Sequence, residues 1–146
     1  MSQLSTILPY MLAGVAVVIV GMHLSFWLAA RRLVGHPAAD VSDLLGSRLA
    51  PEGRTLLYLH SSHCGACHLM ASRIDRLARS HPSIVKIDIQ QEPKVAKRLG
   101  ISATPAVIAI ENGTIAAALF GVQSERRLRK LVIGPGHAAA AGAGKP

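Results

Sequence analysis

The hydrophobic positions of the chain form one long unbroken block and a series of shorter periodic segments. The block covers residues 7–30 and contains no Asp, Glu, Lys or Arg. A helix rises about 1.5 Å per residue, so this block is long enough to cross a hydrocarbon core of about 30 Å. A cleavable signal peptide begins with a positively charged region, yet no Lys or Arg precedes Arg31. We therefore predict an uncleaved transmembrane anchor at 7–30, after a short N-terminal tail at 1–6.

The next segment, 31–54, contains one short amphipathic stretch between turn-forming residues. Asp40 is a residue type that favours a helix N-cap, and Val41 and Leu45 lie on one side of the helix that would follow it. The Pro-Glu-Gly sequence at 51–53 would end that helix. We predict a linker that carries a short helix.

Beyond residue 54, short apolar runs alternate with segments of helical periodicity. Runs rich in β-branched residues indicate strands, whereas apolar residues three and four positions apart indicate amphipathic helices. The predicted strands are 56–59, 84–89, 106–110 and 114–120, and the predicted helices are 66–79, 92–99 and 124–133. Asn112-Gly113 is a strong tight-turn signal and makes a hairpin of the last two strands.

The order of these elements is strand, helix, strand, helix, hairpin and helix. Strands joined through a helix can pair in parallel, and a hairpin adds antiparallel strands. The pattern therefore predicts an α/β domain over 55–133 with a mixed sheet of about four strands. The tail at 134–146 is rich in Gly and Ala, and we expect it to be disordered.

The charge balance narrows the classes of partner. The chain has a formal net charge of +8 and a sequence pI of about 10.4, but only 3% of its residues are aromatic. Single-stranded nucleic acids are bound on aromatic stacking platforms, and the basic residues here are scattered over several predicted elements. We expect no nucleic-acid partner, and we expect solvated basic faces with some attraction to anionic lipid headgroups.

The only two cysteines lie three positions apart, at the turn between a predicted strand and a predicted helix. They close a loop too small to stabilise a fold by constraining the unfolded chain, so the pair indicates redox chemistry. Cys64 lies at a helix N-terminus, where unpaired N–H groups and the helix dipole favour a thiolate. We predict that Cys64 is the exposed nucleophile and that Cys67, one turn into the helix, is the buried resolving thiol.

Other motifs follow the cysteines in a recognisable order. They are the Cys64-Gly65-Ala66-Cys67 helix start, Gly100-Ile101-Ser102-Ala103-Thr104-Pro105, the Asn112-Gly113 hairpin and Gly121 before the last helix. On these motifs the segment from about Thr55 to Ile133 resembles a thioredoxin-fold domain. The resemblance implies a three-layer sandwich with a mixed central sheet, and a thiol–disulfide oxidoreductase that uses no cofactor and no metal.

The resemblance also assigns roles to individual residues. It implies a redox-active Cys64–Cys67 disulfide, with Gly65 and Ala66 between the two cysteines. Pro105 should be in cis beside this disulfide, and Thr104 should offer backbone hydrogen bonds to a bound substrate strand.

The sequence departs from the thioredoxin pattern around the cysteines. Thioredoxins resemble Trp-Cys-Gly-Pro-Cys-Lys here, whereas this chain has His63 before the motif, Ala66 in the Pro position and His68 after it. The family also has a buried Asp in the preceding strand, which assists proton transfer to the resolving cysteine. By alignment that position is Tyr58, which cannot serve as a carboxylate base.

Three histidines are the candidates to handle protons in place of that Asp. They are His60, His63 and His68, and imidazole titrates near neutral pH. A protonated His63 or His68 would also stabilise the Cys64 thiolate electrostatically. The alternative for each is an exposed histidine with no role. These departures favour a dedicated anchored oxidoreductase over a general-purpose thioredoxin.

Three other functions use the same residues. Residues 64–68 satisfy the C-x-x-C-H haem-attachment pattern with His68 as axial ligand, although Thr104-Pro105 has no place in a small cytochrome. The two cysteines with two of the three histidines could bind zinc, in a cramped geometry. A thioredoxin-fold module that binds substrates without exchanging thiols is the third, and the intact CxxC argues against it.

The side of the membrane on which the domain lies is indicated by two opposing features. Similar anchored domains usually face the extracytoplasmic side, where they reduce or oxidise exported proteins or serve cytochrome maturation. Arg31-Arg32, directly after the anchor, favours the cytoplasm by the positive-inside rule. Following the resemblance, we expect a single-pass plasma-membrane protein with an extracytoplasmic domain. Its expected partners are protein or peptide disulfides and dithiols, a protein that recycles the redox site, and lipid around the anchor.

Overall fold

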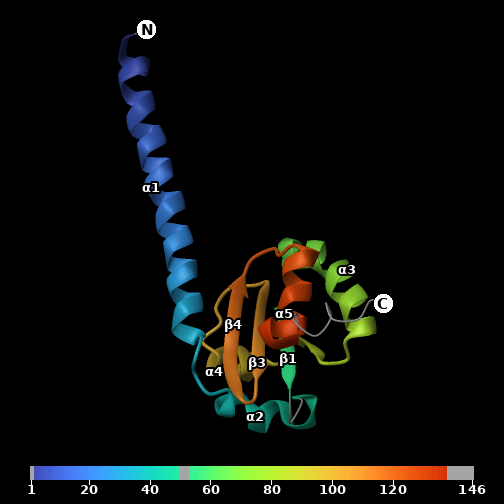
Figure 1. The fold of residues 1–146 in the computed structure, drawn as a ribbon. Coiled ribbons are helices and arrows are strands. Elements are labelled where there is room, and N and C mark those ends of the chain that lie inside the picture. The colour runs from blue at the N-terminus through green and yellow to red at the C-terminus, as the bar shows by residue number, and fades with distance from the viewer. Residues whose placement is uncertain (1, 50–52, 138–146) are drawn as a thin grey trace.

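The computed structural model describes residues 2–49 and 53–137, in which one long helix, α1 (Ser2–Leu33), stands beside an α/β domain (Figure 1). The strands of the domain are β1 (Arg54–His60), β2 (Ile84–Asp88), β3 (Ala106–Glu111) and β4 (Thr114–Phe120). The other helices are α2 (Ala39–Leu45), a 3-10 turn at Gly46–Arg48, α3 (Gly65–Ser80), α4 (Pro93–Arg98) and α5 (Glu125–His137). Every element predicted for the domain is present.

The four strands form one mixed sheet in the order β2-β1-β3-β4. Strand β1 pairs in parallel with β2 and antiparallel with β3, and β3 pairs antiparallel with β4. The predicted mixed sheet is therefore confirmed. Asn112 and Gly113 both have positive φ, 50° and 74°, as a tight turn that matches the twist of a hairpin requires.

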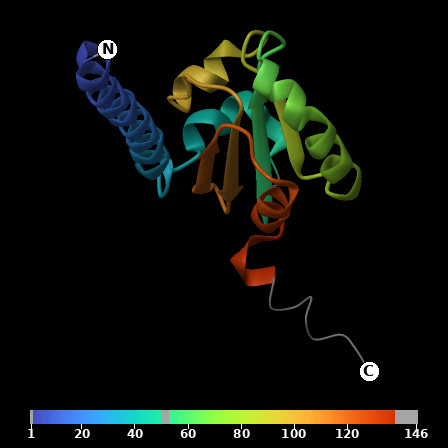
Figure 2. The same cartoon turned by 90° about the horizontal axis from the view of Figure 1, so that it is seen from above.

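The sheet lies between two layers of helices, so the predicted three-layer sandwich is confirmed (Figure 2). Leu57 and Leu59 of β1 point into the core shared with α2 and α4. Leu56 and Tyr58 point to the other face and join the core shared with α3 and α5. Strand β1 is thus buried on both faces, which explains its nearly continuous apolar sequence.

The segment before β1 packs as part of the domain instead of forming a free linker. The Gly35 N–H donates to the carbonyl of Ile115 at 2.9 Å, and the Ile115 N–H donates to the carbonyl of His36 at 3.0 Å. Pro37 and Thr114 form an isolated antiparallel bridge. The chain after α1 therefore runs along the outer side of β4.

The start of α2 differs from the prediction. The helix begins at Ala39 with Ala38 at the N-cap and no side-chain cap hydrogen bond, so the prediction of Asp40 as N-cap is wrong. The Ala38 N–H donates to the carbonyl of Gly113 at 2.7 Å, and the Ala38 side chain is buried with Val41 and Leu45. The tertiary contacts of Ala38 therefore determine where α2 starts, and the capping preference of Asp40 does not.

Helix α1 is long and apolar enough over Ile7–Leu33 to cross a membrane, with a mean hydropathy of 2.1 in an 18-residue window of that stretch. It extends beyond the predicted anchor at both ends. Its C-terminal turns lie beside β4, where the rings of Phe26 and Phe120 are 6.2 Å apart. Ala30 and Leu33 pack against the core cluster of the domain. The end of α1 is therefore attached to the domain.

The last helix bends at Gly134, which has φ 74° and ψ 163°. Regular helix therefore ends at Ile133, as the sequence predicts. Residues 138–146 of the predicted disordered tail lie outside the described residues.

Candidate active site

The two cysteines lie where the buried strand β1 passes into α3. A turn follows β1, in which the Cys64 N–H donates to the carbonyl of Ser61 at 3.2 Å. Cys64 is the N-cap of α3 with extended backbone (φ −99°, ψ 105°), and its Sγ accepts a hydrogen bond from the Cys67 N–H at 3.2 Å. Strand β1 fixes the position of the turn, and the Cys67 N–H in the first turn of α3 points at the Cys64 sulfur.

Cys64 and Cys67 form a disulfide with a Cα–Cα distance of 5.2 Å. Cys67 is only 4% exposed, whereas Cys64 is partly exposed. Gly65 is exposed and Ala66 is half-buried between them. An incoming sulfur can therefore reach Cys64 but not Cys67, an asymmetry that the predicted roles require.

The segment before β3 lies against this disulfide. The Thr104–Pro105 peptide bond is cis, and the carbonyl oxygen of Thr104 lies 3.5 Å from the Cys64 Sγ. Pro105 is buried, and its carbonyl accepts a hydrogen bond from the Gly121 N–H at 2.8 Å. The structure thus brings Thr104 and Pro105 beside the cysteines, as the sequence predicts. The Gly121 hydrogen bond also brings the end of β4 to the same site. We call this end of the domain, with Cys64, Cys67, Thr104, Pro105 and Gly121, the redox end.

Tyr58 lies directly behind the resolving cysteine. Its side chain is 2% exposed, and its hydroxyl donates to the carbonyl of Cys67 at 3.1 Å. Burial, with a smaller contribution from the negative charge of Asp75, raises the pKa of Tyr58 to about 12. The phenol therefore stays protonated at neutral pH and acts as a hydrogen-bond donor, not as a base.

A cavity of about 250 Å³ adjoins Cys67 and is mostly lined by polar side chains. Its lining includes Tyr58, His60, His68, Asp75 and Lys86. Lys86 donates to Asp75 at 2.9 Å, so the wall of the cavity contains an ion pair. Asp75 and Lys86 were not predicted as site residues. Asp75 lies about two helical turns after Cys67 on α3, and Lys86 lies opposite Tyr58 in the β1–β2 register. These positions relative to Cys67 and Tyr58 were the signal that could have identified Asp75 and Lys86.

The three candidate histidines occupy different environments. The ring of His60 stacks on Tyr58, with centroids 5.3 Å apart, and His60 and His68 both line the Cys67 cavity. His63 is exposed, and its Nδ1 lies within hydrogen-bond distance of the Gln90 side-chain amide, 3.0 Å from Nε2. The structure thus brings His60 and His68 to the resolving cysteine and holds the His63 ring against the β2–α4 connection.

The zinc alternative requires several donor side chains gathered at one point. Within residues 2–49 and 53–137, no group of three or more His, Cys, Asp or Glu side chains could hold a metal ion.

The Tyr58 environment predicts a pH effect on stability. The folded state keeps the phenol proton of Tyr58 at a pH where the unfolded state, with a pKa near 10, has released it. The contribution of Tyr58 to the free energy of unfolding is therefore present below pH 10 and is lost as pH rises toward about 12. Tyr58→Phe should remove that part of the decline. It should also lower the stability at neutral pH by about 0.5–1.5 kcal/mol through the lost hydrogen bond. Urea unfolding across this pH range tests both effects, and an unchanged slope in the variant would contradict them.

Comparison with known proteins agrees with this geometry. The thioredoxin family model matches residues 45–133. Mitochondrial thioredoxin of Mus musculus is 32% identical over 92 residues, which cover 61% of this chain and 55% of that protein. A disulfide bond formation protein of Brevibacillus choshinensis is 32% identical over 78 residues, covering 51% of this chain and 66% of that protein. The chain thus spans about half the length of the mitochondrial thioredoxins that it matches.

Solved structures show the same fold. The thioredoxin of Fasciola hepatica superposes with a TM-score of 0.54 at 24% identity, over 65% of this chain and 90% of that chain. Mitochondrial thioredoxin 3 of Saccharomyces cerevisiae gives 0.53 at 19% identity, over 63% and 87%. The family model covers more than half of the chain and includes every residue of the redox end, so this chain belongs to the thioredoxin family.

Proposed function

We propose that this protein is a membrane-anchored thiol–disulfide oxidoreductase that exchanges disulfides with protein substrates. The observation that carries the proposal is the Cys64–Cys67 disulfide at the N-terminus of α3, with Thr104 against it. The names of the relatives, thioredoxin and disulfide bond formation protein, support the same reaction class. No cofactor is needed, because the two thiols carry both electrons.

The reaction follows from the exposure of the two sulfurs. In the reduced protein the Cys64 thiolate attacks a substrate disulfide, whose S–S bond breaks as a new S–S bond joins Cys64 to the substrate. The departing substrate sulfur takes up a proton. The Cys67 thiolate then attacks the Cys64 Sγ, which releases the second substrate sulfur and forms the disulfide of this structure. Two electrons pass to the substrate, and the reverse sequence oxidises a substrate dithiol.

The surroundings favour this division of roles. The Cys67 N–H donates to the Cys64 Sγ at 3.2 Å, and a hydrogen bond to a sulfur at a helix N-terminus stabilises the thiolate form. Cys67 is buried, and both its burial and the neighbouring Cys64 thiolate disfavour a second thiolate at Cys67. Formation of the mixed disulfide removes the charge on Cys64. His60 and His68 line the same cavity as Cys67, which supports them as acceptors of the proton that Cys67 must lose. We propose these two histidines for that step and assign no proton transfer to His63.

An exchange assay tests this function directly. The full chain in detergent, reduced and freed of reductant, should reduce an interchain disulfide in a protein substrate and become oxidised in equal amount. A thiol count before and after the reaction measures both sides. Reduction potentials determined against glutathione would give the direction of electron flow in a given compartment. A reduced protein that leaves the substrate disulfide intact, together with an oxidised protein that leaves a substrate dithiol reduced, would refute the proposal.

We further propose that α1 is an uncleaved anchor in the plasma membrane and that the domain is extracytoplasmic. A cysteine added at the C-terminus should react with a membrane-impermeant maleimide in intact cells. Labelling only after the membrane is breached would instead support the cytoplasmic side, which Arg31-Arg32 favours. The proposed partners are exported protein disulfides or dithiols and a protein that recycles the redox site.

A further inference from the structure

Helix α1 runs antiparallel to β4, so the N-terminal part of α1 extends past the redox end of the domain (Figure 1). Just after the end of α1, the Gly35 N–H donates to the carbonyl of Ile115, the second residue of β4. Further back along α1, Phe26 contacts Phe120 at the last residue of β4. Residues closer to the N-terminus of α1 therefore lie beside residues of β4 that are closer to the disulfide.

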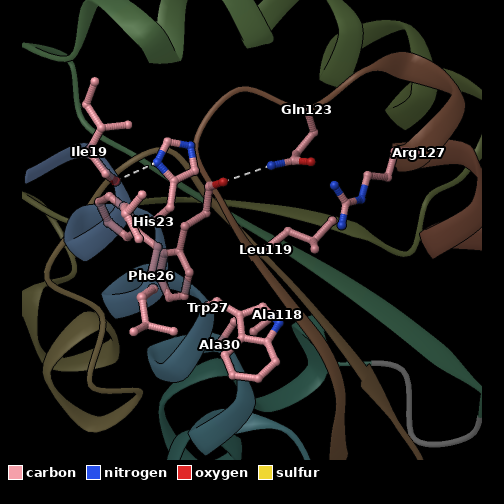
Figure 3. A pocket seen from close by; sticks show the side chains of 12 residues that line it. Ile19, His23, Phe26, Trp27, Ala30, Ala118, Leu119, Gln123 and Arg127 are labelled. Atoms are coloured by element: carbon pink, nitrogen blue, oxygen red, sulfur yellow. Dashed lines mark hydrogen bonds between the residues drawn. The ribbon is translucent and has the colours of Figure 1, made fainter. Parts of the chain in front are cut away.

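The redox end lies at the level of His23 on α1. The next residue after Phe120 is Gly121, whose N–H donates to Pro105 beside the disulfide. A groove of about 720 Å³ between α1 and the domain is lined by His23 on one side and by Gln123 and Arg127 on the other (Figure 3). These polar side chains mark the place where α1 passes the redox end.

The length of α1 fixes where a bilayer can lie. From Ser2 to Met22 the helix is about 31 Å long at 1.5 Å per residue, which matches a hydrocarbon core of about 30 Å. The rest of α1, from His23 to Leu33, is beside β4 and is not available to span the membrane without embedding the domain. This placement shifts the span toward the N-terminus from the 7–30 predicted from the sequence. The membrane surface therefore falls near His23, level with the disulfide.

The surface around the disulfide suits this position. Three of its segments, 61–72, 99–105 and 120–124, contain no Asp, Glu, Lys or Arg, although such residues make up 16% of the chain. A fourth segment, the β2–α4 connection that contacts His63 through Gln90, carries Asp88 and Glu92. Leu69 on α3 is 65% exposed and Val122 after β4 is 45% exposed. Segments without formal charge and with exposed apolar side chains lose little hydration free energy when they lie against a membrane or a membrane protein.

We propose that the redox end faces the bilayer surface, and that its exchange partner is a cysteine pair held at that surface by an integral membrane protein. This inference rests on the proposed oxidoreductase function and on α1 as the anchor. A soluble protein would have to enter the space between the domain and the lipid to reach Cys64. A cysteine pair of a membrane protein already lies at the required height.

The orientation can be measured in nanodiscs with the full chain. In a background of Cys64→Ser and Cys67→Ser, a single fluorophore is attached through Val122→Cys at the redox end. The matched control carries it through Thr114→Cys, an exposed residue at the other end of β4, about 20 Å away. Lipids with a headgroup quencher should quench the Val122 label and leave the Thr114 label bright. Equal quenching, or stronger quenching at Thr114, would overturn the proposed orientation.

The partner class is tested with two probe disulfides in proteoliposomes. One is a transmembrane peptide with a cysteine pair at the headgroup level, and the other is a soluble peptide with the same cysteine loop. The full chain should exchange with the membrane probe at least about tenfold faster, because both reactants are confined at one height. A flexible Gly-Ser insertion after Val34, combined with Phe26→Ser to remove the ring contact with Phe120, should free the domain from α1 and remove most of this preference.

The outcomes separate the two proposals. Exchange with neither probe would refute the oxidoreductase function and this inference together. Equal rates with both probes would keep the function and overturn the preference for a membrane partner. An unchanged preference after the insertion would show that confinement alone is sufficient, and would overturn the role of the α1–β4 contact.

Discussion

Replacing Cys64 by Ser should abolish disulfide exchange, with a loss of about 10³-fold or more in rate, because the variant has no nucleophile that can form the mixed disulfide. The fold should not change, since Cys64 is only partly buried and a serine is also a favourable N-cap. Stopped-flow measurement of the exchange rate, together with the unfolding midpoint, separates loss of chemistry from loss of structure.

The matched variant is Cys67→Ser, which keeps the nucleophile and removes the resolving thiol. It should accumulate a covalent complex between Cys64 and the substrate, visible on a non-reducing gel and released by reductant. A Cys64→Ser protein that retains full activity in the cell would instead support a binding module that works without thiol exchange. Stable complexes formed through Cys67 would reverse the two roles.

Truncating Ile74 to Ala should lower the free energy of unfolding by about 2–5 kcal/mol. Ile74 is 0% exposed and lies in the core between α3 and the sheet, with Met70 and Leu77. Since a domain of this size is stable by only about 5–15 kcal/mol, the loss is a large share of the total. Chemical denaturation of the full chain in detergent measures it.

The control for this variant is Leu69→Ala on the same helix. Leu69 is 65% exposed, so its truncation should change stability by no more than about 0.5 kcal/mol. Equal losses for the two variants would mean that α3 is not packed on the sheet as described.

The elements of the domain could be predicted because each has a strong local signal. The β-branched runs, the Asn112-Gly113 turn and the helical periodicity of α3 depend on neighbouring residues only. The cysteine pair could be assigned for the same reason, because a CxxC at a helix start brings its own dipole and N–H groups. Thr104 and Pro105 were placed through the resemblance, since nothing local indicates what they contact.

The remaining features depend on contacts between distant parts of the chain. Asp40 has the better capping side chain, but α2 begins earlier because Ala38 is held by Gly113. The Asp75–Lys86 ion pair joins α3 to β2, and no periodicity in the sequence reports such a pairing. The position of α1 beside β4 is of the same kind, because an apolar block indicates a membrane span and not what the end of the span contacts.

The bridge between Pro37 and Thr114 has a consequence for any shortened form of the protein. Strand β4 is one of the two edge strands of the sheet, and an open edge can pair with a second molecule. In the full chain, residues 35–38 occupy the first half of that edge through Ile115 and Gly113. A soluble fragment that begins at Val34 keeps this cover. One that begins at Asp40 uncovers the edge, and we expect it to self-associate although its redox site is intact.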